Sequence, residues 1–166
     1  MCLSQSTPIA SPWFADKGKI APTIAPRVLV EEDDAATRHA MVATLRAAGF
    51  DTVGCGGPDH QGKHPCPLEV GEDCPAAVEA DVIFFSFRLA EQRNRLILKK
   101  IRRVNRRTPI VVEIPEPQIN RYQDVLNGTT LVHSPLTRQS LTKAVLDAWN
   151  GPDRLQRVLR ESLPSN

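Results

Sequence analysis

The sequence predicts an α/β protein built on one doubly wound, parallel, five-stranded sheet. Short apolar runs rich in β-branched or aromatic residues alternate along the chain with segments of helical periodicity. Such alternation is typical of a parallel sheet that helices cover on both faces. The predicted strands are 28–30, 51–54, 82–85, 109–114 and 130–133.

Helices are expected between these strands. Asp34 has the short polar side chain of an N-cap, and the helix that it begins should run through Ala48 and stop at Gly49. A second long helix is expected over about 90–106, and Pro135 is expected to open a third. The residues expected to face the core from the helix at 90–106 are Leu96, Ile97, Ile101 and Val104.

The chain divides into three parts by composition. Residues 1–26 are rich in proline and poor in apolar side chains, so they predict a flexible leader. Residues 27–149 carry the strand and helix pattern and form the predicted domain. Residues 150–166 predict an amphipathic tail helix.

Bulk composition is that of a globular protein, with 41% hydrophobic and 24% charged residues and a net charge of +2 in 166 residues. No apolar run approaches the roughly 20 residues that a membrane span needs. The first residues also lack the basic and apolar segments of a secretory signal. We therefore expect a cytoplasmic protein without membrane association, in which stable disulfides are not expected.

Several segments carry a further pattern in a fixed order. Residues 27–34 read Arg-Val-Leu-Val-Glu-Glu-Asp-Asp, and the segments 80–86, 108–112 and 132–135 follow along the chain. Together they resemble a bacterial response-regulator receiver domain over 27–149. The resemblance implies a flavodoxin-like sheet and a place in two-component signalling or a phosphorelay.

Receiver domains transfer a phosphoryl group to an aspartate, and the resemblance assigns the corresponding positions here. The acidic pair that holds Mg²⁺ is Glu32 and Asp33, but the nucleophile position is Ser86, the hydroxyl position is Ile114 and the lysine position is Ser134. A serine hydroxyl without an adjacent base does not replace a carboxylate as the acceptor. The pattern therefore predicts a degenerate pocket that is not phosphorylated in the ordinary way.

Two interpretations of the acidic pair stay open. Glu32 and Asp33 either form a solvated turn that the N-terminus of the following helix favours, or retain weak Mg²⁺ binding.

The segment 55–75 is rich in proline, glycine and cysteine and replaces the second helix of a receiver with a loop. Three thiols and an imidazole in this loop make a candidate tetrahedral zinc set, although the segment lacks a CxxC pair. The candidate ligands are Cys55, His64, Cys66 and Cys74. A redox or disulfide role, or inert buried thiols, are the alternatives.

The helix expected at 90–106 is strongly basic. It is a solvated face, a surface for an acidic protein, or a contact for nucleic acid. Nucleic acid is the least favoured partner because the segment has no aromatic residues for stacking and no helix-turn-helix follows. The candidate partner-binding residues are Arg95, Lys99, Arg102, Arg103 and Arg106.

These observations predict a stand-alone pseudo-receiver that is not an enzyme. We expect it to bind a signalling or transcription protein, or a second copy of itself, through the last strand and helix. The alternatives are a metal or redox sensor at the cysteine loop and a nucleic-acid-associated regulator using the basic helix. No cofactor is required, and zinc is the candidate metal of the cysteine loop.

Overall fold

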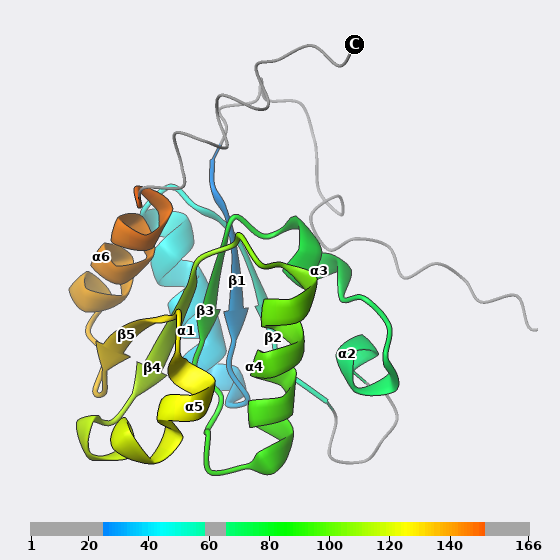
Figure 1. Ribbon diagram of the computed structural model, residues 1–166. Helices are drawn as coiled ribbons and strands as arrows, with labels where there is room; N and C mark the ends of the chain where they lie inside the picture. The colour runs from blue at the N-terminus through cyan, green and yellow to red at the C-terminus, as the bar shows by residue number, and fades with distance from the viewer. Residues whose placement is uncertain (1–24, 59–65, 152–166) are drawn as a thin grey trace, which may run out of the picture.

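The computed structural model describes residues 25–58 and 66–151, and it confirms the predicted fold class. Five parallel strands form one sheet in the order β2-β1-β3-β4-β5 (Figure 1). The strands are β1 (Arg27–Glu31), β2 (Asp51–Cys55), β3 (Val82–Phe85), β4 (Ile110–Ile114) and β5 (Thr130–His133).

Helices cover both faces of this sheet (Figure 1). Helices α1 (Ala35–Ala47) and α6 (Arg138–Trp149) lie on one face. On the other face lie α2 (Pro67–Val70), α3 (Pro75–Glu79), α4 (Gln92–Val104) and α5 (Gln123–Leu126), and the 3-10 turns η2 (Glu116–Gln118) and η3 (Asn120–Tyr122) lead into α5. None of the described helices is long and apolar enough to cross a membrane.

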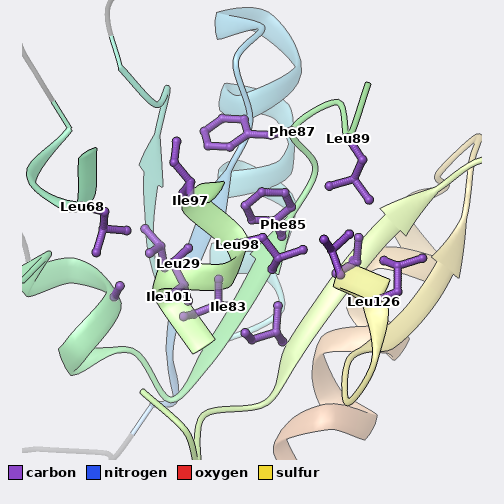
Figure 2. Close-up of a cluster of buried hydrophobic side chains, with 14 of the residues drawn as sticks. Leu29, Leu68, Ile83, Phe85, Phe87, Leu89, Ile97, Leu98, Ile101 and Leu126 are labelled. Carbon is purple, nitrogen blue, oxygen red and sulfur yellow. The ribbon is translucent and has the colours of Figure 1, made fainter. Parts of the chain in front are cut away.

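Alternation along the central strands divides the core into two clusters. Neighbouring strand residues point to opposite faces, so Phe84 of β3 packs towards α1 and α6 while Phe85 packs towards α4. All four residues of β3 are buried, as expected for a parallel strand covered on both sides. Figure 2 shows the cluster on the α4 face, with side chains that include Leu29, Ile83, Phe85, Ile97, Leu98 and Ile101.

The predicted limits of the first helix are confirmed to within a residue. The Asp34 side chain accepts a hydrogen bond of 2.7 Å from the Thr37 N–H and so caps α1. Ala48 is the C-cap, and Gly49 leaves the helix with a φ of 93°, a conformation that favours glycine.

The predicted inner face of α4 is partly wrong. Leu96 is 50% exposed and Val104 is 36% exposed, whereas Leu98 is fully buried. The buried positions follow helical spacing and are Asn94, Ile97, Leu98 and Ile101. Asn94 hides this pattern in the sequence because it is polar, yet it is buried and donates its side-chain N–H to the Arg88 carbonyl.

The predicted start of the last helix is also wrong. Pro135 follows a cis peptide bond from Ser134 and precedes α6, which begins at Arg138. Thr137 is the N-cap, because its hydroxyl accepts the Ser140 N–H while the Ser140 hydroxyl accepts the Thr137 N–H. This reciprocal pair satisfies two backbone donors of the first turn, so the helix starts there.

In the described part of the segment after β2, residues 56–58 and 66–81, the helices are the short α2 and α3, with a proline in the first turn of each. Gly71 ends α2 with a φ of 87°. Most of the predicted leader, His64, and the predicted tail helix from residue 152 onward lie outside the described residues. The division into three parts therefore stays a prediction.

Candidate functional site

Polar side chains from four strands meet at the carboxyl edge of the sheet. Ser86 follows β3, and its Oγ lies 2.7 Å from Oε2 of Glu32, which follows β1. The same Oγ lies 2.6 Å from Oε2 of Glu113 in β4. Ser134, which follows β5, donates a hydrogen bond of 2.7 Å to the other carboxylate oxygen of Glu113. Carboxyl ends of parallel strands share one edge, so this meeting follows from the topology.

The contacts of Ser86 require an extra proton. A hydroxyl has one hydrogen, and Ser86 faces two carboxyl groups that both need a donor when ionised. Burial raises the pKa of Glu32, and its hydrogen bond with Asp33 acts in the same direction. A proton on Glu32 resolves this conflict, because Ser86 then needs to donate only to the Glu113 carboxylate.

The backbone of the acidic turn is held by neighbouring donors. Glu32 Oε1 accepts the Asp34 N–H at 2.8 Å. The Arg38 guanidinium donates to the carbonyls of Glu32 and Asp33. Glu32 is only 7% exposed, so its side chain is packed into the molecule, whereas Asp33 is partly buried and Asp34 is exposed.

Asp33 differs from Glu32 in charge state. Partial burial opposes its ionisation, but hydrogen bonds from Glu32 and Arg88 and the charge of Arg88 outweigh this, so the pKa of Asp33 is lowered. Arg88 Nη2 lies 3.2 Å from Asp33 Oδ2. The pair of acidic residues therefore holds one carboxylate paired with an arginine and one buried carboxyl group.

This edge does not fit a magnesium ion as it stands. The Glu32 oxygens are engaged by Ser86 and the Asp34 N–H, and Asp33 is engaged by Arg88. Within residues 25–58 and 66–151, no group of three or more His, Cys, Asp or Glu side chains is arranged to hold a metal ion.

A cavity of about 740 Å³ opens over these groups and collects the predicted pocket residues. Its apolar walls come from α1, α6 and the loops that precede α4 and α6. All five predicted residues line it, namely Glu32, Asp33, Ser86, Ile114 and Ser134.

Glu113 is the site residue that sequence reasoning missed. The resemblance assigned its neighbour Ile114 to the β4 position, and Ile114 is 1% exposed and packs in the core cluster on the α4 face. Adjacent side chains along a strand point to opposite faces, so a shift of one residue in the assignment exchanges Glu113, which contacts Ser86, for Ile114, which does not. The available signal was a single charged residue inside the apolar run of β4.

The three described cysteines are free thiols that pack against the core from β2 and from the starts of α2 and α3. Burial raises the pKa of Cys55, Cys66 and Cys74, and the nearby Glu31 acts in the same direction. Protonated thiols are weak nucleophiles, so these positions suit packing better than oxidation. The proposed zinc set includes His64, which lies outside the described residues.

Glu31 is a buried carboxyl group beside this cysteine cluster. It is 2% exposed at the end of β1, and burial raises its pKa to about 7, although a hydrogen bond with Cys55 opposes the shift. Glu31 could not be assigned a separate role from the sequence, because an acidic run at a strand end is usually solvated.

The predicted partner-binding residues separate into two groups, and one of them, Arg106, lies in the turn after α4 because the helix ends at Val104. Arg95 donates to the carbonyls of Leu89 and Ala90, and Lys99 pairs with Asp124 at 3.3 Å. Arg102 donates to the Val125 carbonyl. In contrast, the side chains of Arg103 and Arg106 make no hydrogen bond or ion pair with any described residue.

Comparison with known proteins places this fold. No family model and no curated protein matches the sequence. Among solved structures, a response regulator receiver domain protein from Clostridium thermocellum aligns with a TM-score of 0.59 at 17% identity, over 81% of this chain and 98% of that one. The chain has the fold of a response-regulator receiver domain.

Other receiver structures give the same result. The chemotaxis response regulator CheY4 of Vibrio cholerae aligns with a TM-score of 0.57 at 18% identity, over 75% of this chain and 98% of its own. NtrX from Brucella abortus aligns with a TM-score of 0.62 at 16% identity, over 86% of this chain but only 31% of its own. The likeness supports the receiver fold, and the assignment of a degenerate receiver pocket around Ser86 stays a prediction.

Proposed function

We propose that this chain is a pseudo-receiver in signal transduction or transcription regulation, which binds a protein partner without being phosphorylated on an aspartate. The receiver fold of its structural neighbours supports the signalling role. One observation carries the rest: Ser86 stands at the end of β3, hydrogen-bonded between Glu32 and Glu113.

This arrangement opposes phosphoryl transfer on two grounds. The Ser86 hydroxyl is a weaker acceptor than an aspartate carboxylate because it is not ionised near neutral pH, even though it donates a hydrogen bond to Glu113. A transferring phosphoryl group is anionic and needs cations around its oxygens. Here it would meet Glu32 and Glu113 instead, while Ser134 supplies no positive charge and Arg88 is paired with Asp33.

The last strand and helix are the proposed binding face. In the described sheet, β5 pairs only with β4, so its other edge is unpaired. Leu146 on α6 is 44% exposed, although most large apolar residues of the domain are buried. An unpaired strand edge and an exposed leucine on the helix that packs against that strand favour contact with another polypeptide.

The experiment measures self-association by sedimentation velocity across a concentration series, with and without acetyl phosphate and Mg²⁺. The proposal predicts that the phosphodonor leaves the distribution of species unchanged, since binding is constitutive. A phosphodonor-induced dimer would show an ordinary receiver switch and overturn the proposal. Leu146→Glu tests the face, and Val78→Glu, at an exposed apolar residue of α3 on the other face, is the matched control.

A further inference from the structure

A second cleft lies at the opposite end of the sheet from Ser86, between the C-terminal half of α4, the start of β4 and the turn that leads into β5. Its volume is about 640 Å³. The lining residues are Lys99, Arg102, Arg103, Asn105, Arg106, Thr108, Ile110 and Gly128. Half of these side chains are cationic and none is acidic.

The cations of this cleft are poorly neutralised. Arg103 and Arg106 are exposed and have no polar partner among the described residues. The side chains of the Lys99–Asp124 ion pair are 51% and 69% exposed, so the pair contributes little to stability. Another anion can therefore replace Asp124 at Lys99. The helix dipole favours positive charge at the C-terminal end of α4, and this offsets part of the repulsion among the cationic side chains of the cleft.

The turn into β5 forms the opposite wall. Gly128 has a φ of 75°, and a Cβ added there would lie 3.2 Å from Arg102 Nη2. The turn backbone therefore comes close to this guanidinium, whose Nη1 donates to the Val125 carbonyl. Arg102 is fixed by that contact, so the cleft has one positioned guanidinium and two unpaired ones.

We propose that this cleft binds the diphosphate or triphosphate group of a small molecule. Its volume falls in the range of small-ligand sites, about 300–1,000 Å³. Guanidinium groups bind phosphate oxygens through paired hydrogen bonds, and several of them in one cleft match the charge density of a polyphosphate. An acidic protein spreads its carboxylates over a much larger contact, about 800 Å² per partner.

This inference goes beyond the proposed function and does not depend on it. The cleft uses the basic helix and the amino end of β4, whereas the pseudo-receiver proposal rests on the carboxyl edge around Ser86. Loss of polyphosphate binding would leave that proposal untouched, and phosphorylation of the chain would leave the cleft untouched.

The test is isothermal titration calorimetry of the full chain with inorganic triphosphate, pyrophosphate, monophosphate and adenosine triphosphate. We expect saturable one-site binding of triphosphate and pyrophosphate that is tighter than binding of monophosphate. If adenosine triphosphate binds as tightly as inorganic triphosphate or more tightly, the ligand is a nucleotide. If it binds more weakly, the ligand is free polyphosphate.

Paired variants separate the site from general charge. The double variant Arg103→Gln/Arg106→Gln should weaken triphosphate binding by about tenfold or more, because each substitution removes charge-assisted hydrogen bonds to the ligand. Arg107→Gln/Arg138→Gln removes the same charge outside the cleft and should change affinity by less than about twofold. All four residues are exposed, so both variants should fold, which circular dichroism verifies.

Three results would overturn the proposal. Absence of saturable triphosphate binding would remove the site, and equal losses in both double variants would show general charge attraction only. Tighter binding of a poly-glutamate peptide or of single-stranded DNA than of triphosphate would assign the basic surface to a macromolecule.

Discussion

Ser86 lies between Glu32 and Glu113, and its hydroxyl has one hydrogen to donate to these two carboxyl groups. This local geometry makes the pocket sensitive to any added negative charge. The acceptor aspartate of an ordinary receiver would put a third carboxyl group within contact of these two acids, with no lysine to offset it.

Ser86→Asp should therefore destabilise the protein. The neutral, similarly shaped Ser86→Asn is the matched control, because the difference between the two variants isolates the charge. In urea unfolding at pH 8 we expect Ser86→Asp to be less stable than Ser86→Asn by ~1–3 kcal/mol. The difference should shrink at pH 5, because burial raises the pKa of Glu32 and the pocket then carries less negative charge. Equal stability at pH 8 would mean that the pocket accommodates a further carboxylate.

Glu31 makes the fold depend on pH. Its pKa is about 7 in the folded protein against a usual value of 4.5, so the unfolded chain loses this proton first as pH rises. The free energy of unfolding therefore falls between about pH 4.5 and 7 and stays lower above that, by at most ~3 kcal/mol from this group.

Glu31→Gln should remove that dependence. Urea unfolding at pH 5, 6, 7 and 8 should give a flatter profile than wild type, with the variant more stable at pH 8. The exposed Glu116→Gln serves as the control and should keep the wild-type slope. An unchanged slope in Glu31→Gln would show that Glu31 ionises normally.

Helix α4 shows how burial is decided at the scale of one element. Leu96 and Leu98 are two residues apart, but Leu98 is fully buried against the sheet and Leu96 is 50% exposed. Figure 2 shows Leu98 within the core cluster beside Ile97 and Ile101.

Truncating these two leucines should have unequal effects. Leu98→Ala should cost ~2–5 kcal/mol because it leaves a cavity in the core. Leu96→Ala removes a side chain that is half in solvent and should cost less than about 1 kcal/mol. Thermal or urea unfolding of both variants measures this. Similar losses in the two variants would contradict the assigned face of α4.

Elements with strong local signals were predictable from the sequence. The β-branched and aromatic runs located all five strands, and Asp34 and Gly49 located the ends of α1. The inner face of α4 was not predictable from apolar spacing, because a buried Asn94 stands where an apolar residue was expected. The start of α6 depended on a pair of hydroxyls, Thr137 and Ser140, which a preceding proline obscured.

At the scale of the whole molecule, topology brings the candidate site together. Glu32, Ser86 and Ser134 could be placed from the sequence because each directly follows a strand, and parallel strands end at one edge. Glu113 could not, because the face of a β4 residue depends on register, and a one-residue difference exchanges Glu113 for Ile114. The resemblance therefore located the pocket but not the network that occupies it.

The same network defines what the molecule should do as a whole. A receiver changes state when its aspartate takes a phosphoryl group, whereas here the corresponding hydroxyl is hydrogen-bonded between two acids. We expect one stable state, in which the receiver fold presents a constant binding face.

Intact-protein mass spectrometry after incubation with acetyl phosphate and Mg²⁺ tests this account most directly. A receiver with an aspartate at the end of its third strand, in the same reaction, shows that the donor is active. The account predicts that the mass of this protein stays unchanged while the control gains a phosphoryl group. A gain of one phosphoryl group that disappears on changing Ser86, Glu32, Asp33 or Glu113 would contradict it.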